Sequence, residues 1–383
     1  MLEKFKVKNF KKFKEELIFD LTKVKKYTFN ENIIKNNILN MALIYGSNGS
    51  GKSNLGFAML DIIFHTTENE KIKDFYNNYL YGNGILSDRA EFTYEFNFDG
   101  DKVIYTYLKK NVDELIKEEL YLNGEKVLYM DREEKETKLS IKEIDYLRLD
   151  SIFTSNLSLL KYVLSTVPFN NDSVYYKLRN FLEKMLWFRS VGVNNYLGYR
   201  LESNSIVNEI LGISQADRNE KIIQENLKKF EKFLKESGVD LILSTREADG
   251  LRVIEVEIDS EDKKEKRYIN FFQIASSGTV SLAAFYSWYK NLKDMSFVFI
   301  DEFDAFYHYK LSKLIIKKLK EESNAQVVLT THSTNLMNNE LLRPDAYFIL
   351  KNNKLKSIPE LTDKELREAH NIEKLFKSGA FDE

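Results

Sequence analysis

Eight consecutive residues near the start of the chain have the spacing of a phosphate-binding loop, G-x-x-x-x-G-K-[ST]. They follow the apolar run Met41–Tyr45 and precede a segment of helical character from Lys52 to about Phe64. Glycines let backbone N–H groups wrap phosphates at a helix N-terminus, a lysine neutralises the β and γ oxygens, and a serine hydroxyl binds Mg²⁺. The pattern predicts an ATP site with Mg²⁺ as its metal, formed by Gly46, Ser47, Asn48, Gly49, Ser50, Gly51, Lys52 and Ser53.

Two adjacent carboxylates end a second apolar run. Phe297–Ile300 is fully apolar and is followed directly by Asp301 and Glu302. At the end of a buried strand, Asp301 would hold Mg²⁺ through water, and Glu302 would polarise the water that attacks the γ-phosphate. The alternative is an acidic strand end that leads into a solvated loop. Because the same chain contains a phosphate-binding loop, we expect the catalytic arrangement.

His332 is one of only four histidines and follows another apolar run, Gln326–Thr330. The carboxyl ends of parallel strands meet at one edge of a sheet, so His332 would lie at the same edge as the phosphates. We therefore expect it to sense the γ-phosphate. A structural histidine at a strand end is the alternative.

A segment of small residues, Ala275–Thr279, precedes a helix predicted from about Gly278 to Leu292. Serine hydroxyls and a glycine at a helix N-terminus form an anion site. The same residue types also form ordinary N-caps, which is the alternative. The candidate anion-binding residues are Ser276, Ser277 and Gly278.

The elements that must position these residues change in character along the chain. Lys4–Phe13 alternates with period two and predicts a strand, and Leu17–Leu21 predicts another. Glu91–Tyr129 alternates aromatic and polar residues around turns at Asp99-Gly100 and Asn123-Gly124, which predicts an antiparallel meander. From 150 to 238 the spacing becomes helical. The two apolar stripes predicted there are Tyr176, Phe181, Leu182, Met185 and Leu186, and then Leu227, Phe230, Phe233 and Leu234.

Strand-like alternation returns over Asp240–Asp259 and near Tyr268, and the last part of the chain alternates strand, helix and strand over 296–301, 308–321 and 326–330. A βαβ unit there means that the nucleotide core is split in sequence. The predicted fold class is α/β, with a mostly parallel core sheet, an antiparallel β-subdomain and a helical insertion. The expected domains are an N-terminal lobe over 1–140, the helical insertion over 141–238, and a C-terminal lobe over 239–383.

Composition limits the partners and the compartment. The chain has 57 Lys and Arg against 59 Asp and Glu, a net charge of -2, so no global basic field indicates nucleic acid. It contains no cysteine, which excludes disulfides and thiolate metal sites and fits a reducing cytosol. The opening residues lack the apolar region of an export signal, and no apolar run approaches a membrane span. We expect a cytoplasmic protein with no membrane partner.

These motifs resemble those of ABC-type ATPases and occur in the same order. The order is the phosphate-binding loop, the serine-glycine helix N-terminus, the acidic strand end and the strand-end histidine. Within that group the chain is similar to the overcoming-lysogenization-defect and abortive-infection ATPases of phage defence. The similar segments are Lys8–Phe13, Ala275–Thr279, Asp301–Phe306, Thr331–Leu336 and Leu342–Asp345.

This resemblance implies an ABC-type ATPase head that works as a homodimer or a higher homo-oligomer. Ser276 and Gly278 of one copy would close over ATP held by Lys52 of the other. Lys11 matches a basic residue near the phosphates in such ATPases, and a solvated charge on an edge strand is the alternative. The chain departs from the family at Ala275 and Thr279, where leucine and glutamine are commoner, and no Q-loop glutamine can be assigned.

The resemblance also bears on partners. About fifty residues follow His332, too few for the Toprim nuclease of full-length relatives, so the chain resembles stand-alone ATPase subunits whose effector, such as a nuclease, is a separate protein. The leading hypothesis is an ATPase that acts as a sensor or a scaffold and regulates that effector. The alternatives are an SMC/RecF-like repair ATPase that binds nucleic acid through the helical insertion, and the nucleotide-binding subunit of a transporter.

Overall fold

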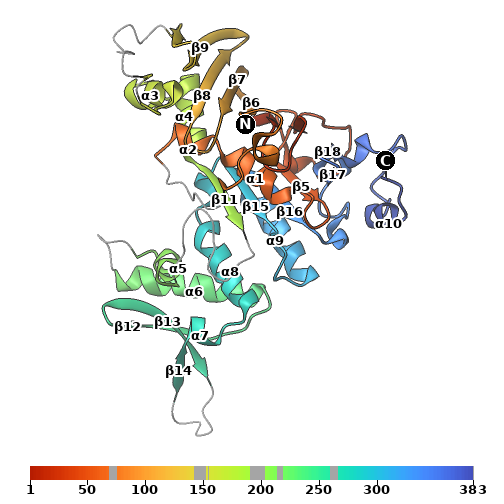
Figure 1. Cartoon of the computed structure of the whole chain (residues 1–383). Helices are drawn as coiled ribbons and strands as arrows, with labels where there is room; N and C mark the ends of the chain where they lie inside the picture. The colour runs from red at the N-terminus through yellow and green to blue at the C-terminus, as the bar shows by residue number, and fades with distance from the viewer. Residues whose placement is uncertain are drawn as a thin grey trace. The chain divides into compact units, whose positions relative to one another are not determined.

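The computed structural model describes residues 1–68, 76–141, 152–153, 155–189, 203–213, 219–258 and 266–382. Its residues group into two compact units, which are described separately (Figure 1). Unit 1 contains Met1–Trp187, Asp294–Asp301 and Asn324–Glu383, and unit 2 contains Phe188–Lys293 and Glu302–Ser323. The division of the chain into 1–140, 141–238 and 239–383 stays a prediction.

A six-stranded, largely parallel sheet has the strand order β11-β15-β16-β5-β17-β18. Strands β15, β16, β5 and β17 are parallel, and β18 pairs antiparallel with β17. All residues of β5, β15 and β16 are buried, as expected for apolar strands covered on both faces. The predicted βαβ unit is confirmed, because β15 and β16 are parallel neighbours on either side of α9 (Tyr309–Glu322) in the chain. The strands are β5 Met41–Tyr45, β11 Met185–Arg189, β15 Phe297–Asp301, β16 Gln326–Thr331, β17 Tyr347–Lys351 and β18 Lys354–Ser357.

The second sheet of unit 1 is the predicted antiparallel meander, extended by the N-terminal strands to the order β10-β9-β8-β7-β6-β1-β2. Alternate residues of β6 are buried, because successive side chains of a strand point to opposite faces. The turns at Asp99-Gly100 and Asn123-Gly124 have positive φ at both residues, which two-residue hairpins of this type require. The strands are β1 Leu2–Lys8, β2 Leu17–Asp20, β6 Ala90–Phe98, β7 Asp101–Lys109, β8 Leu115–Leu122, β9 Glu125–Asp131 and β10 Glu136–Leu139, and a separate pair is β3 Ile34–Lys35 with β4 Ile38–Leu39.

The helices of unit 1 depart from the predicted pattern at the first apolar stripe. The first apolar stripe was predicted as one helix, but α4 ends at Glu183, and Met185 and Leu186 belong to strand β11. Pairing at the edge of the parallel sheet overrides the helical spacing there. Within α4, Tyr175 is buried in place of Tyr176. The helices are α1 Lys52–Leu60, α2 Ile63–Thr66, α3 Leu159–Thr166, α4 Val174–Glu183 and α10 Ile372–Lys377.

Unit 2 combines helices with a small antiparallel sheet of order β12-β13-β14. Its longest helix, α6, buries all residues of the second predicted stripe, which confirms that part of the prediction. The helices of unit 2 are α5 Ser203–Leu211, α6 Glu220–Glu236, α7 Phe271–Ile274, α8 Ser277–Tyr289 and α9, and its strands are β12 Leu243–Ala248, β13 Leu251–Ile258 and β14 Arg267–Asn270.

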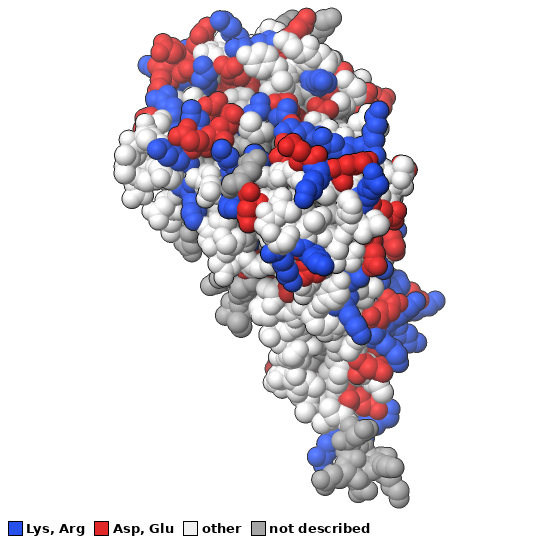
Figure 2. Space-filling view, turned by 90° about the vertical axis from the view of Figure 1, so that its right-hand side faces the viewer, with Lys and Arg blue, Asp and Glu red and all other residues white. Residues whose placement is uncertain are grey.

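The surface mixes both signs of charge. On the face shown in Figure 2, Lys and Arg side chains lie among Asp and Glu side chains. None of the helices in the described ranges combines the length and the apolar character that a bilayer crossing requires.

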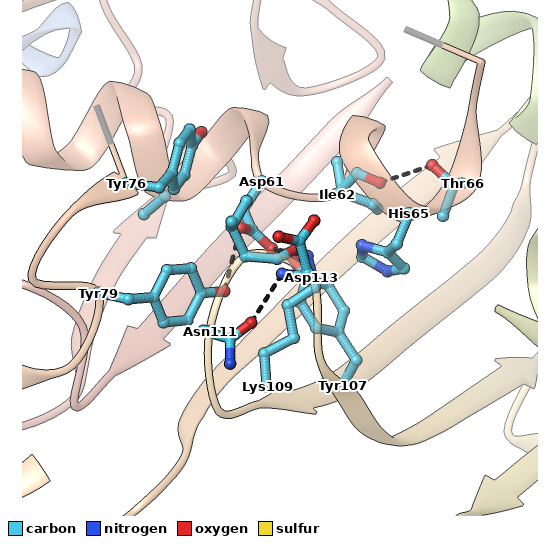
Figure 3. Close-up of polar contacts among 12 residues, drawn as sticks. Asp61, Ile62, His65, Thr66, Tyr76, Tyr79, Tyr107, Lys109, Asn111 and Asp113 are labelled. Atoms are coloured by element: carbon cyan, nitrogen blue, oxygen red, sulfur yellow. Dashed lines mark hydrogen bonds and ion pairs between the residues drawn. The ribbon is translucent and has the colours of Figure 1, made fainter. Parts of the chain in front are cut away.

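A buried ion pair joins the end of α1 to the antiparallel sheet. Lys109 Nζ lies 2.8 Å from Asp61 Oδ2, and both side chains are 0% exposed (Figure 3). Burying two charges is costly, but removing one partner leaves the other charge uncompensated, which typically costs about 3–5 kcal/mol. The pair therefore fixes where α1 lies against β7.

We expect Lys109→Met to lower the free energy of unfolding by about 3–5 kcal/mol, because Asp61 would remain buried without its counter-charge. Urea unfolding followed by circular dichroism measures the change. Lys110→Met is the control, since Lys110 makes only partly exposed ion pairs, whose usual worth is about 0–1 kcal/mol. Equal stability of the two variants would contradict the role of the buried pair.

Candidate nucleotide-binding site

The predicted phosphate-binding loop lies between the buried strand β5 and the N-terminus of α1. Gly49 and Gly51 have φ of +71° and +110°, values that favour glycine. A Cβ on Gly51 would also lie 3.2 Å from the Phe13 ring. Gly51 is the N-cap of α1 and has no side chain with which to cap this helix end. Backbone N–H groups of the first turn are thus oriented as a cradle for an anion.

Lys52 and His332 meet at this loop. Lys52 is 5% exposed, and its Nζ donates to the carbonyl of Gly46 at 2.8 Å and to that of Ser47 at 3.3 Å. His332 Nδ1 lies 3.1 Å from Lys52 Nζ and 3.2 Å from the Gly46 carbonyl oxygen. The side chains predicted to bind and to sense the γ-phosphate are therefore neighbours in space, although 280 positions separate them in the chain.

The strand register explains this meeting. Thr331 of β16 lies opposite Tyr45 of β5, so the residues that follow both strands emerge at one edge of the sheet. Asp301 ends β15, the other neighbour of β16, and Thr330 Oγ1 donates to Asp301 Oδ1 at 2.7 Å. Both side chains of this hydrogen bond are 0% exposed. The bond fixes the orientation of a carboxylate at the carboxyl end of the sheet.

The donors present fit Mg²⁺. Ser53 supplies a hydroxyl in the first turn of α1 and Asp301 a buried carboxylate, and Mg²⁺ prefers such hard oxygen ligands. Among the described residues no group of three or more His, Cys, Asp or Glu could hold a metal. In Mg²⁺ sites of P-loop ATPases, one or two protein oxygens and the phosphates of the nucleotide share the ion.

Glu302 follows Asp301 in an unusual conformation. Its φ is +49°, a left-handed value that is uncommon for a residue with a side chain and that costs energy. Its carboxylate lies 3.8 Å from Arg189 of β11 and is 21% exposed. Such strained residues cluster at functional sites. Sequence reasoning missed Arg189, because no local motif marks it.

The serine-glycine segment is the N-terminus of α8. Ser276 is the N-cap, and its Oγ accepts from Thr279 N at 3.2 Å. A Cβ on Gly278 would lie 3.1 Å from the carbonyl oxygen of Phe306, so glycine allows the segment after β15 to approach this turn closely. The side chains of Ser276 and Ser277 are exposed. A ligand or a second protein molecule can therefore reach this helix end.

Two adjacent lysines follow β1, and Lys12 contacts the phosphate-binding loop. Its Nζ donates to the carbonyl of Gly49. Lys11, which the resemblance had suggested, donates to the carbonyl of Asn77 at 3.0 Å and lies beside the rings of Phe57 and Tyr76. Burial lowers the pKa of Lys11 to about 8. The role of Lys11 near the phosphates stays a prediction, and the contact of Lys12 with Gly49 is one that no motif indicated.

A half-open cavity of about 520 Å³ adjoins the loop. Besides loop residues and His332, it is lined by apolar side chains from distant parts of the chain, among them Ile349, Leu350, Phe376 and Phe381. No sequence motif indicated that residues after His332 would line the site.

Solved structures similar to this chain include SMC head domains. One is an SMC head bound to the C-terminal winged-helix domain of ScpA (16% identity, 93% of this chain and 96% of that chain, TM-score 0.43). Another is the SMC head domain from Thermotoga maritima (16% identity, 93% and 97% coverage, TM-score 0.42). No curated protein matches the chain significantly.

A protein-family model covers the candidate site as a whole. The model described as "AAA domain, putative AbiEii toxin, Type IV TA system" matches residues 41–338, from the first residue of β5 to beyond His332. This range contains the phosphate-binding loop, the N-terminus of α8, the acidic end of β15 and the strand-end histidine. More than half of the chain is matched, and the chain therefore belongs to the AAA-domain family of putative AbiEii toxins of type IV TA systems.

Proposed function

We propose that this protein binds ATP with Mg²⁺ at the Gly46–Ser53 loop and hydrolyses it. The observation that carries the proposal is the meeting of Lys52 Nζ and His332 Nδ1 at 3.1 Å beside a glycine loop at a helix N-terminus. Backbone N–H groups and Lys52 would hold the phosphates, and Ser53 with Asp301 would hold Mg²⁺.

Hydrolysis needs a group that orients and activates water. In the proposal Glu302 accepts a proton from the attacking water and His332 contacts the γ-phosphate. The bound Mg²⁺ would neutralise charge on the β and γ oxygens. The strained backbone of Glu302 supports this assignment, because strain of this kind persists where function requires it.

We further propose that two copies share each ATP. The N-terminus of α8 has exposed hydroxyls on Ser276 and Ser277, and a helix N-terminus favours negative charge. Ser276, Ser277 and Gly278 of one copy would then cover the phosphates held by Lys52 of its partner. Turnover would require the dimer.

We also propose, from the resemblance of the motifs, that ATP-dependent closure controls a toxic effector encoded separately, as in abortive infection of phage-infected cells. The family description adds a type IV TA system, in which it names a putative toxin. A protein is therefore the proposed partner, and nucleic acid stays possible. On the face seen in Figure 2 both signs of charge are interspersed, whereas binding to a phosphate backbone uses clustered Lys and Arg.

Ser276→Arg tests the shared site. The bulky cation should block closure of the dimer, so we expect the variant to bind ATP as a monomer and to lose the ATP-dependent dimer. We also expect it to turn over ATP about 10²-fold more slowly, which is the usual loss when one transition-state donor is removed. Nucleotide titration, light scattering and phosphate release measure the three properties.

Ser173→Arg is the matched control, because Ser173 is also an N-cap, at the start of α4. It should dimerise and turn over ATP like the parent chain. Parental turnover by Ser276→Arg would refute the shared site, and failure of the parent chain to bind ATP would refute the proposed function itself.

A further inference from the structure

Three hydroxyl or ammonium groups converge on Asp61 at the far end of α1 (Figure 3). Asp61 Oδ2 accepts from Lys109 Nζ at 2.8 Å and from the Tyr107 hydroxyl at 2.9 Å, and Oδ1 accepts from the Tyr79 hydroxyl at 3.0 Å. Asp61, Lys109 and Tyr107 are 0% exposed and Tyr79 is 5% exposed. The carboxylate thus ties α1 to β7 and to the segment around Tyr79.

The stability of helix α1 does not explain a carboxylate at this position. A negative charge at the C-terminal end of a helix opposes the helix dipole, and burying it adds a desolvation cost. Lys109 offsets the charge, and two tyrosines complete the hydrogen bonding. Asp61 therefore serves the tertiary arrangement of the elements that it joins.

The Tyr79 segment leads back toward the phosphate-binding loop. Lys11 N donates to the Tyr79 carbonyl at 2.8 Å, and Tyr81 N donates to the Asn9 carbonyl at 3.3 Å. The Phe10 ring packs edge-on against the Tyr79 ring, with centroids 5.0 Å apart. The Tyr79 segment is therefore paired with residues Asn9–Phe13, which we call the arm.

The end of the arm touches the loop itself. Lys12 Nζ donates to the Gly49 carbonyl, and the Phe13 ring lies 3.2 Å from the position of a Cβ on Gly51. Gly51 and Lys52 begin α1, and Asp61 follows its last residue. The contacts thus connect α1 to the Tyr79 segment, the Tyr79 segment to the arm, and the arm to the phosphate-binding loop, which leads back into α1.

We propose that Tyr79 is a positioning residue for nucleotide binding. Its hydroxyl holds the arm at a fixed place relative to α1, and the arm in turn sets the shape of the loop through Lys12 and Phe13. This inference rests on the proposed ATP site. Burial, and then the charge of Asp61, raise the pKa of Tyr79 well above its usual range, so the hydroxyl keeps its proton and acts as a donor.

Tyr79→Phe tests the inference, because it removes one oxygen and keeps the ring that packs on Phe10. We expect the Kd for ATP to rise about 2- to 13-fold, the factor to which the net worth of one hydrogen bond converts. Isothermal titration calorimetry measures Kd, and a thermal melt measures stability.

Tyr107→Phe is the matched control. It removes a buried hydroxyl that donates to the same carboxylate, but Tyr107 lies on β7 and makes no contact described here with the arm. We expect both variants to melt at lower temperature, whereas only Tyr79→Phe weakens ATP binding. Parental affinity in Tyr79→Phe, or equal weakening in Tyr107→Phe, would overturn the proposal.

A double-mutant cycle with Lys12→Met tests the route through the arm. If Tyr79 acts through Lys12, the effect of Tyr79→Phe should shrink in the Lys12→Met background. If the fold-changes in Kd of the two single variants multiply in the double variant, Tyr79 and Lys12 act independently, and the route through Lys12 is overturned. Absence of ATP binding by the parent chain would instead overturn the proposed function, which distinguishes the two failures.

Discussion

Lys52→Ala should weaken ATP binding by at least about 10²-fold, since it removes charge-assisted hydrogen bonds that are each worth about 1.5–3 kcal/mol. Lys52 Nζ donates to the carbonyl oxygens of Gly46 and Ser47 and lies beside His332, and Ala would remove these contacts. Titration with a fluorescent ATP analogue measures the affinity, and a thermal melt verifies the fold.

Lys8→Ala controls for the loss of one positive charge, because Lys8 is exposed at the end of β1. Its affinity for ATP should equal that of the parent chain. If Lys52→Ala bound ATP as tightly as this control, the Gly46–Ser53 loop would not be the nucleotide site.

Glu302→Gln should leave ATP affinity within about twofold of the parent and lower kcat about 10²- to 10⁴-fold, the usual contribution of a general base. Glutamine has the same shape, so the change removes the carboxylate charge while keeping side-chain size. Because closure would occur without hydrolysis, the ATP-bound dimer should accumulate. Phosphate release and size-exclusion chromatography with ATP measure the two effects.

The comparison variant is Glu321→Gln, which neutralises an exposed carboxylate on α9. Its turnover should match that of the parent. Parental turnover in Glu302→Gln would assign the activation of water to another residue, and a monomeric Glu302→Gln protein in ATP would argue against closure by nucleotide.

Local patterns were enough to predict the parts of the site that sit at the ends of buried strands. The runs before Gly46, Asp301 and His332 are continuous and apolar, so their strands could be placed and their shared edge inferred. The aromatic meander was equally accessible, because period-two alternation and Asp-Gly or Asn-Gly turns are local signals.

Features that depend on tertiary contacts could not be predicted in this way. Met185 was included in a helical stripe, but it lies in strand β11. The turn after β1 brings Lys12 to Gly49, a contact that no motif indicated. The ion pair between Asp61 and Lys109 joins a helix end to a strand end 48 residues later, and neither residue belongs to a motif. Such pairs follow from how elements pack, which no single segment encodes.

The position of β5 in its sheet affects how the protein folds during synthesis on the ribosome. Both neighbours of this strand, β16 and β17, come from the last part of the chain, at Gln326–Thr331 and Tyr347–Lys351. A nascent chain that has emerged only as far as residue 320 holds the glycine loop but lacks the strands that flank it. Contacts so distant in sequence form slowly, and until they form the exposed apolar strand is prone to aggregation. The glycine loop should therefore gain both flanking strands only after Lys351 has been synthesised, and a chain that stops before β17 should not bind ATP.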